Sequence, residues 1–374
     1  MSIIAYVGID AHESSLSICA FTRDSLVPVF ETQVPNERTR VCGLFRRLSQ
    51  EYDLRCCYEA SGLGYVLHRW LANINVSCAV IAPSLIPKKP GNHIKTDKRD
   101  ACELAKLFRS GHLTSVIIPS EEEEGARALV RLRGSLIRDI VSWKNQINKF
   151  LGGQHLQFSE GSRWTEKHWL WLRSLKFAAP NDFIWSEMLA MLDYKVSRLK
   201  EVDNRICAYA QKPQYKEKVA HLCCFRGVAT LTAMTLLTEI IDFDRFKNPK
   251  ALMAYLGLVP GEHSSGDRRR QGQITKAGNS RCRRALVEAA WKYIHRPSRS
   301  LDMIKRQEGA PAWIVAHSWK AQHRLHKKYQ SIVQRGKDRK TAVVAVAREL
   351  VGFLWAVMVT TNAASPAAPK ANVS

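Results

Sequence analysis

The sequence predicts an α/β domain over about the first 120 residues and a mainly helical remainder. Three apolar runs of strand-like length open the chain, and helical spacing first appears after them. Beyond residue 120, apolar residues recur at spacings of three and four over long stretches, which is typical of packed helices. With 374 residues, the chain is long enough for two or three domains with cores of their own.

Strands and helices alternate over about the first 115 residues. The predicted strands are 3–9, 16–22, 27–33, 54–58 and 76–82, and the predicted helices are 39–52, 64–73 and 100–110. Three consecutive strands followed by helix–strand alternation is the order of an RNase H or RuvC-like domain. The loop 83–95, with three prolines and four basic residues counting His93, is expected to be mobile and to face nucleic acid.

The rest of the chain is predicted to be helical. Heptad-like seams over 129–150 and 189–209 predict an antiparallel helical hairpin, which either packs within one subunit or forms a dimerisation arm. A helical stretch over 311–359 carries a basic middle, and 362–374 is expected to be disordered. The predicted domains are a metal-binding RuvC-like domain (1–120), a coiled-coil region (121–215), a helical domain with basic carboxyl-terminal helices (216–361) and the tail (362–374).

Charge is the strongest feature of the composition. The 57 Lys and Arg residues outnumber the 34 Asp and Glu residues, which leaves a net charge of +23. Such an excess suits nucleic acid, and a ribosome-associated or anionic-membrane protein is the alternative. The ten cysteines are scattered, and their vicinal pairs suit neither a disulfide nor a zinc knuckle, so we expect a reducing, cytoplasmic setting. Arg348 and Glu349 interrupt the apolar run 341–361, which therefore predicts a buried helix and no membrane contact.

Four acids in the first hundred residues indicate a metal site. Asp10 and Glu59 end predicted strands, and Asp97 and Asp100 lie three apart at the start of a predicted helix, so they share a face. Carboxylates in such a cluster hold Mg²⁺, with Mn²⁺ as the alternative, and the ion acts on phosphate oxygens. Lys95 and Lys98 flank Asp97, which suits a helix end lying against a phosphate backbone.

A second cluster lies far downstream, where glycines and serines over 257–266 lead into seven cations with no acid among them. A serine beside guanidinium groups is a candidate nucleophile toward phosphorus, because Arg stabilises the charge that develops there. The alternative is a phosphate-binding loop whose hydroxyl only donates a hydrogen bond. The seven cations are Arg268, Arg269, Arg270, Lys276, Arg281, Arg283 and Arg284.

Seven segments in this order resemble the DEDD transposases of the IS110 family of insertion sequences, the recombinases guided by a bridge RNA. The resemblance covers nearly the whole chain. It departs from the family at Ala229, where a glycine is usual in the turn 226–229. The segments are GID (8–10), EASG (59–62), KTDKRDA (95–101), AYLGLVP (254–260), SSG (264–266), TKAGN (275–279) and RRAL (283–286).

This resemblance implies a DNA transposase that catalyses RNA-guided, site-specific strand exchange. Asp10, Glu59, Asp97 and Asp100 would hold Mg²⁺, and Ser265, with Ser264 as its neighbour, would attack DNA and form a transient phosphoserine link. The implied partners are the DNA of the element ends and target, a structured non-coding guide RNA, and further copies of the chain in a dimer or tetramer. Two alternatives remain: a RuvC-like junction nuclease that uses water, and a non-enzymatic nucleic-acid-binding protein.

Overall fold

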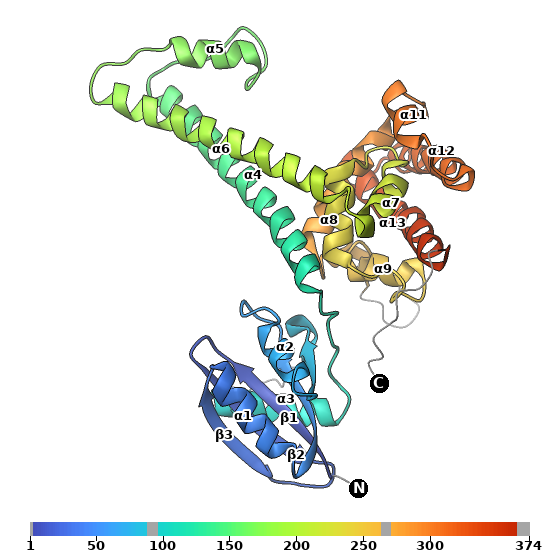
Figure 1. The fold of residues 1–374 in the computed structure, drawn as a ribbon. Coiled ribbons are helices and arrows are strands. Elements are labelled where there is room, and N and C mark those ends of the chain that lie inside the picture. The colour runs from blue at the N-terminus through green and yellow to red at the C-terminus, as the bar shows by residue number, and fades with distance from the viewer. Residues whose placement is uncertain (1–2, 88–95, 263–270, 365–374) are drawn as a thin grey trace. The chain divides into compact units, whose positions relative to one another are not determined.

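The structure, a computed structural model, describes residues 3–87, 96–262 and 271–364. It divides into two units, Met1–Pro119 (unit 1) and Ser120–Ser374 (unit 2). Unit 1 is built on a sheet, and unit 2 is almost entirely helical (Figure 1). The predicted combination of an α/β amino-terminal part and a mainly helical remainder is therefore confirmed.

Unit 1 is centred on a five-stranded mixed sheet with the spatial order β3-β2-β1-β4-β5. β1, β2 and β3 pair antiparallel, whereas β4 and β5 continue the sheet parallel to β1. This arrangement is the one expected of an RNase H-like domain, and the closer RuvC-like assignment stays a prediction. The strands are β1 (Ile3–Ala11), β2 (Ser15–Thr22), β3 (Phe30–Pro35), β4 (Tyr52–Glu59) and β5 (Ser77–Ile81).

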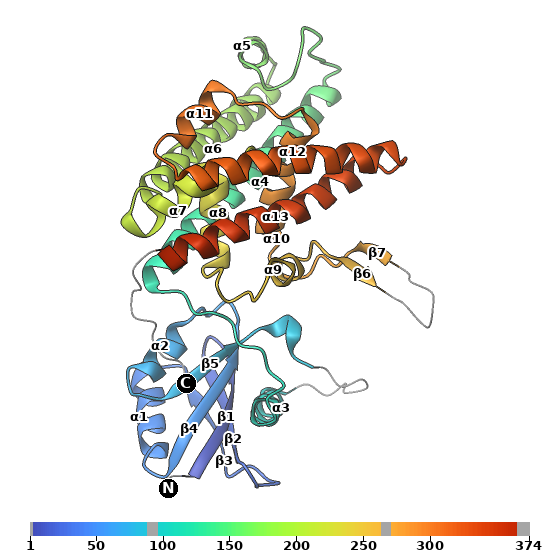
Figure 2. The ribbon, with the colours of Figure 1, turned by 90° about the vertical axis from the view of Figure 1, so that its right-hand side faces the viewer.

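Helices cover both faces of this sheet. α1 (Arg38–Leu48) and α2 (Val66–Ala72) lie on one face and α3 (Asp97–Arg109) lies on the other (Figure 2). Successive residues of a strand point to opposite faces, so Val7 and Ile9 pack with α1 and α2, while Gly8 between them meets α3. A 3-10 turn, η1 (Pro83–Leu85), follows β5.

Several predicted boundaries in unit 1 shift. The helix predicted over 39–52 ends at Leu48, and Tyr52 already belongs to β4. β3 begins at Phe30 rather than at residue 27, because Leu26 and Val27 point into solvent and Pro28 offers no amide for sheet pairing. α3 begins at Asp97 rather than at Asp100, because the hydroxyl of Thr96 accepts a hydrogen bond from the amide of Arg99 and caps the helix. Both acids therefore lie in the first helical turn, where the helix dipole favours negative charge.

A long helical hairpin extends from the body of unit 2. α4 (Glu121–Gly153) and α6 (Asn181–Tyr209) lie side by side and run in opposite directions, with α5 (Glu166–Ser174) at the far end (Figure 1). Ile147, Leu172 and Trp185 form a small core there. A capping box between Ser120 and Glu123 starts α4.

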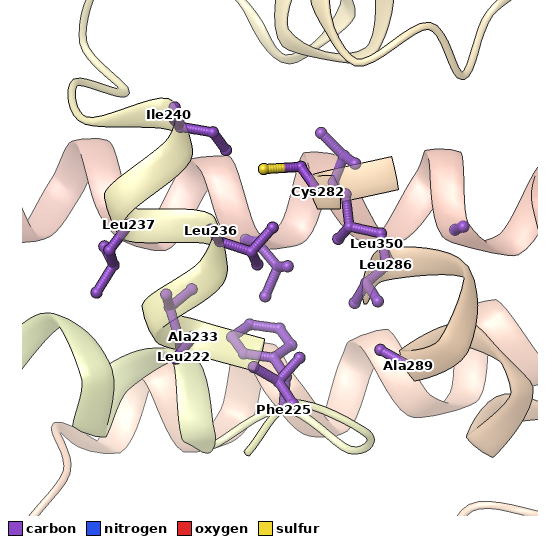
Figure 3. Packing of buried hydrophobic residues seen from close by; sticks show 14 of the residues in the cluster. Leu222, Phe225, Ala233, Leu236, Leu237, Ile240, Cys282, Leu286, Ala289 and Leu350 are labelled. Atoms are coloured by element: carbon purple, nitrogen blue, oxygen red, sulfur yellow. The ribbon is translucent and has the colours of Figure 1, made fainter. Parts of the chain in front are cut away.

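The body of unit 2 surrounds a single apolar core. Phe225 is fully buried among side chains of α8, α10 and α13 (Figure 3). A short hairpin of β6 (Pro260–Glu262) and β7 (Gln271–Ile274) leaves this body between α9 and α10. The helices are α7 (Pro213–Cys223), α8 (Thr230–Ile240), α9 (Pro249–Tyr255), α10 (Ser280–Ala290), α11 (Leu301–Gln307), α12 (Ala312–Gln334) and α13 (Arg339–Ala364), with a 3-10 turn η2 (Trp291–Ile294) after α10.

α13 is a core helix. It is long and apolar enough to cross a membrane, with a mean hydropathy of 2.0. However, Val346, Leu350 and Leu354 are buried in the core of unit 2, which agrees with the prediction of a buried helix. The prediction of disorder from residue 362 is wrong at its start, because α13 continues to Ala364 and Asn362 donates a hydrogen bond to Asp244 (Nδ2–Oδ2, 2.9 Å).

The cysteines depart from expectation at one pair. Both vicinal pairs are free, as predicted, and they are buried. Cys19 of β2 and Cys102 of α3 are joined in a disulfide with their Cα atoms 5.1 Å apart, which the predicted reducing setting does not favour. The sequence could not reveal this pair because 83 positions separate the two residues and only the packing of α3 on the sheet brings them together.

Candidate functional site

Three side chains converge where β1 ends and α3 begins. Asp10 is the penultimate residue of β1, His12 follows that strand, and Asp97 is the first residue of α3. The Nε2 atom of His12 lies 3.3 Å from Oδ2 of Asp10 and 3.4 Å from Oδ1 of Asp97. One ligand atom from each of the three lies within 4.8 Å of the others, which is close enough for a shared metal ion.

Gly8 is what allows α3 to approach this end of β1. A Cβ atom at Gly8 would lie 2.1 Å from the carbonyl oxygen of Ala101 and 2.4 Å from the amide nitrogen of Ala105. Because both contacts are with helix backbone, any side chain at this position would push α3 away. The glycine thus lets α3 pack closely on β1, so that the acids at the start of the helix lie near the acid end of the strand.

The electrostatics at this end of the sheet favour a cation. Burial raises the pKa of Asp10 above its ordinary value of 3.8, and although His12 acts against this shift, the charges of Asp100 and Asp97 add to it. A raised carboxylate pKa means that the negative charge is poorly compensated in the folded protein. A divalent cation would supply the missing compensation.

The other two predicted acids lie near this group without joining it. Ile9 pairs with Tyr58, so Asp10 and Glu59 follow on neighbouring parallel strands and, by alternation, project toward the face that α3 covers. Glu59 is exposed and Asp100 is half-buried. The group that closes within 4.8 Å contains neither of them and instead contains His12, which no sequence pattern had indicated.

The second candidate site is described only at its base. Gly257 and Gly278 both have a positive φ (+65° and +66°), and each fits closely against the opposite segment. A Cβ at Gly278 would lie 1.8 Å from the carbonyl oxygen of Tyr255, and a Cβ at Gly257 would lie 2.3 Å from that of Ala277. The backbones that flank the β6–β7 hairpin therefore interlock. Ser264, Ser265, Arg268, Arg269, Arg270 and, in unit 1, Lys95 lie outside the described residues.

The predicted phosphate-binding cations have different surroundings. Arg283 donates from Nη1 to the carbonyl oxygens of Leu256 (2.9 Å) and Ala277 (2.8 Å), so it holds the base of the hairpin. Arg284 pairs with Glu288 (3.0 Å), and Lys98 pairs with Glu31 (2.6 Å). Lys276 and Arg281 are exposed. A role in binding nucleic acid stays a prediction for all of them, and Arg283 has a structural role besides.

A buried carboxylate that the sequence patterns do not single out supports this region. Glu239 of α8 is almost fully buried and accepts two hydrogen bonds from Arg131 of α4, each of 2.8 Å. Asn279 donates to the same carboxylate (2.7 Å) and caps α10 by accepting from the amides of Arg281 and Cys282. Burial acts to raise the pKa of Glu239, but the hydrogen bonds and charges of its partners outweigh it, so the pKa lies below its ordinary value of 4.5.

Two family models match the chain. A model for the DEDD transposases of the IS110 type matches residues 7–155, and a model described as the transposase IS116/IS110/IS902 family matches residues 219–303. The first match contains the converging acids, and the second contains the β6–β7 hairpin and Asn279.

Individual proteins are similar over most of the chain. A candidate transposase of Sinorhizobium fredii, y4qE, is 39% identical over 302 residues, which cover 80% of this chain and 74% of that protein. The transposase for insertion sequence element IS1533 of Leptospira borgpetersenii is 33% identical over 89% of this chain and 97% of its own length. The pilin gene-inverting protein of Moraxella lacunata is 22% identical over 94% and 95% of the two chains.

Proposed function

The chain belongs to the IS110 family of transposases, and we propose that it carries out RNA-guided, site-specific strand exchange of DNA with Ser265 as the nucleophile. The observation that carries the proposal is the meeting of Asp10, Asp97 and His12 at the end of β1, in a domain that matches the DEDD transposases. Guidance by a structured RNA and assembly as a homo-oligomer follow from the family resemblance. The net charge of +23 suits two nucleic-acid partners.

The residues at the end of β1 fit a hard divalent cation. They offer carboxylate oxygens and one imidazole nitrogen within 4.8 Å, and the raised pKa of Asp10 indicates uncompensated negative charge. We propose that Asp10 and Asp97 hold Mg²⁺, or alternatively Mn²⁺, with Glu59 and Asp100 at the rim. A divalent ion held there would supply positive charge to phosphate oxygens.

The proposed chemistry is a transesterification. The Ser265 oxygen forms a bond to phosphorus, the bond from phosphorus to the neighbouring nucleotide's oxygen breaks, and that oxygen takes up a proton as the serine gives one up. Attack by a hydroxyl of another strand reverses the step and releases the serine, so the strands are exchanged without hydrolysis. Arg268, Arg269, Arg270 and Lys276 are proposed to hold the phosphate backbone.

Adduct trapping tests the nucleophile. Full-length protein is incubated with Mg²⁺, the structured guide RNA and end-labelled duplex DNA that carries the element end, and the products are separated in denaturing detergent. We expect a protein–DNA adduct with the wild type and with Ser264→Ala, which is the matched control, and no adduct with Ser265→Ala.

Two results would contradict the proposal. An adduct that persists in Ser265→Ala removes this serine from the reaction. Cleaved DNA without any adduct from the wild type instead favours the junction nuclease, because attack by water leaves no covalent link.

A further inference from the structure

α12 presents two chemically opposite faces. Ile314, Ala321 and Leu325 are buried in the core of unit 2, and Ser318 and Tyr329 lie on the same side. The other side exposes Lys320, His323, Arg324, Lys327 and Ser331, which recur at spacings of three and four. In Figure 2 the helix crosses unit 2 beside α13, against which the buried side packs.

The exposed side of α12 is positively charged and largely uncompensated. No Asp or Glu occurs between residues 309 and 337, whereas six Lys or Arg residues do. Arg324 pairs with Glu349 of α13. Within the described residues, the structure gives Lys320, Lys327 and Lys328 no carboxylate partner, and we call these three lysines the α12 basic face.

The α12 basic face lines a groove of about 720 Å³. Pro297, His326 and Ser331 are among its other lining residues. His326 contacts the carbonyl oxygen of Tyr293 (3.1 Å), which fixes α12 against η2, and Arg299 stacks over the ring of Trp319 (4.8 Å). Basic side chains therefore lie both on α12 and on the segment that follows η2. The contacts of His326 and of Trp319 hold these two parts of the chain against each other.

We propose that the α12 basic face is a binding surface for the phosphate backbone of double-stranded DNA. Lys320 and Lys327 lie about 10 Å apart along the helix, since each residue rises by about 1.5 Å. Lysines arranged in this way attract phosphates without reading bases. The surface lies beyond residue 303, where the second family match ends, so it would add a contact distant in sequence from both matched segments.

Duplex DNA is the occupant of this surface, because the chain belongs to a transposase family and transposases act on DNA. This binding rests on the proposed function only in taking DNA as the substrate, and it involves neither the metal nor Ser265. A structured RNA carries the same charge and is the alternative that the experiment must separate.

The experiment compares full-length wild type with the triple variant Lys320→Gln/Lys327→Gln/Lys328→Gln. Affinity for labelled duplex DNA and, separately, for a labelled structured RNA is measured in EDTA over a range of salt concentrations, so the result does not depend on catalysis. The matched control is Lys200→Gln/Lys216→Gln/Lys247→Gln, which removes three exposed lysines of unit 2 and the same total charge. Thermal unfolding of each variant checks that the fold is intact.

We expect the triple variant to lose affinity on the order of tenfold at moderate salt, and its slope of log K against log salt to become shallower by about 3. The loss should be equal for element-end and unrelated duplexes, because phosphate contacts carry no sequence information. The control variant should keep a slope within about one of the wild type.

Three results would overturn the inference. The first is an unchanged slope in a folded triple variant, and the second is an equal loss in the control. The third is a selective loss of affinity for structured RNA with duplex DNA binding retained. None of these would affect adduct formation by Ser265, so this inference and the proposed function can fail separately.

Discussion

Asp10 in unit 1 and Glu239 in unit 2 are both shielded carboxylates, yet their surroundings are opposite. Burial raises the pKa of Asp10 and two nearby acids add to this shift, whereas the contact with His12 acts against it. Glu239 is held by Arg131 and Asn279, and its pKa is lowered although it is more deeply buried. The comparison teaches that the partners of a buried carboxylate, and not its burial alone, decide whether its pKa is raised or lowered.

Asp10→Asn tests the first half of this comparison and should have the largest effect. We expect Mg²⁺-dependent strand exchange to fall on the order of 10³-fold or more, because a bound metal ion contributes several kcal/mol to such reactions. Strand-exchange assays over a Mg²⁺ titration measure this loss. Asp24→Asn, an exposed acid of the same unit, is the matched control and should keep full activity.

The same variant should not weaken the metal-free fold. The pKa of Asp10 is raised in the folded state, so its ionised form destabilises the protein above that pKa, and stability is gained as the pH falls through it. The asparagine side chain of the variant lacks this charge, so metal-free stability near neutral pH should be equal or higher. Mg²⁺ should raise the melting temperature of the wild type and not of the variant. A clear loss of metal-free stability would make Asp10 a structural residue like Glu239.

Local patterns in the sequence predict the first carboxylate but not the second. Asp10 ends an apolar run, and strand ends of a sheet are where such acids meet, so its proposed role as a metal ligand follows from a few neighbouring residues. Glu239 lies in the apolar helix α8, and its partner Arg131 is 108 positions away. Its role appears only when α4, α8 and α10 are packed together.

The same limit explains what was missed elsewhere. His12 is a single histidine just beyond a strand, and nothing in its local pattern shows that α3 brings Asp97 to it. Arg283 belongs to a run of cations that indicates phosphate binding, yet its guanidinium bonds to two backbone carbonyls, which only the tertiary fold places there.

Glu239→Gln tests the second half of the comparison and should have an intermediate effect. We expect the free energy of unfolding of unit 2 to fall by about 2 kcal/mol, because the charged hydrogen bonds from Arg131 are weakened while the donor groups stay in place. Urea unfolding followed by tryptophan fluorescence measures this loss, since nine of the ten tryptophans lie in unit 2.

The pH dependence of this loss follows from the lowered pKa of Glu239. The stability that the ionised Glu239 contributes is present above the ordinary Glu pKa of 4.5 and disappears as the pH falls through the lower value of the folded state. The difference between wild type and Glu239→Gln should therefore shrink in acid. A difference that is constant from about pH 7 to about pH 3 would show that charge is not what the variant removes.

Asn279→Ala should have the smallest of these effects and divides the Glu239 contact from the helix cap. We expect the free energy of unfolding to fall by about 1 to 2 kcal/mol, because the side-chain amide of Asn279 both caps α10 and donates to Glu239. Asn279→Ser keeps a capping oxygen on a shorter side chain that does not reach Glu239, so it should recover about 0.5 to 1 kcal/mol of that loss. The part not recovered by serine measures the contact with Glu239, and urea unfolding of the two variants side by side gives both values.

If Asn279→Ala and Asn279→Ser are equally stable, the cap contributes nothing and the whole loss belongs to the contact with the Glu239 carboxylate. If serine restores full stability, Glu239 is satisfied by Arg131 alone, and the contrast with Asp10 reduces to a single ion pair.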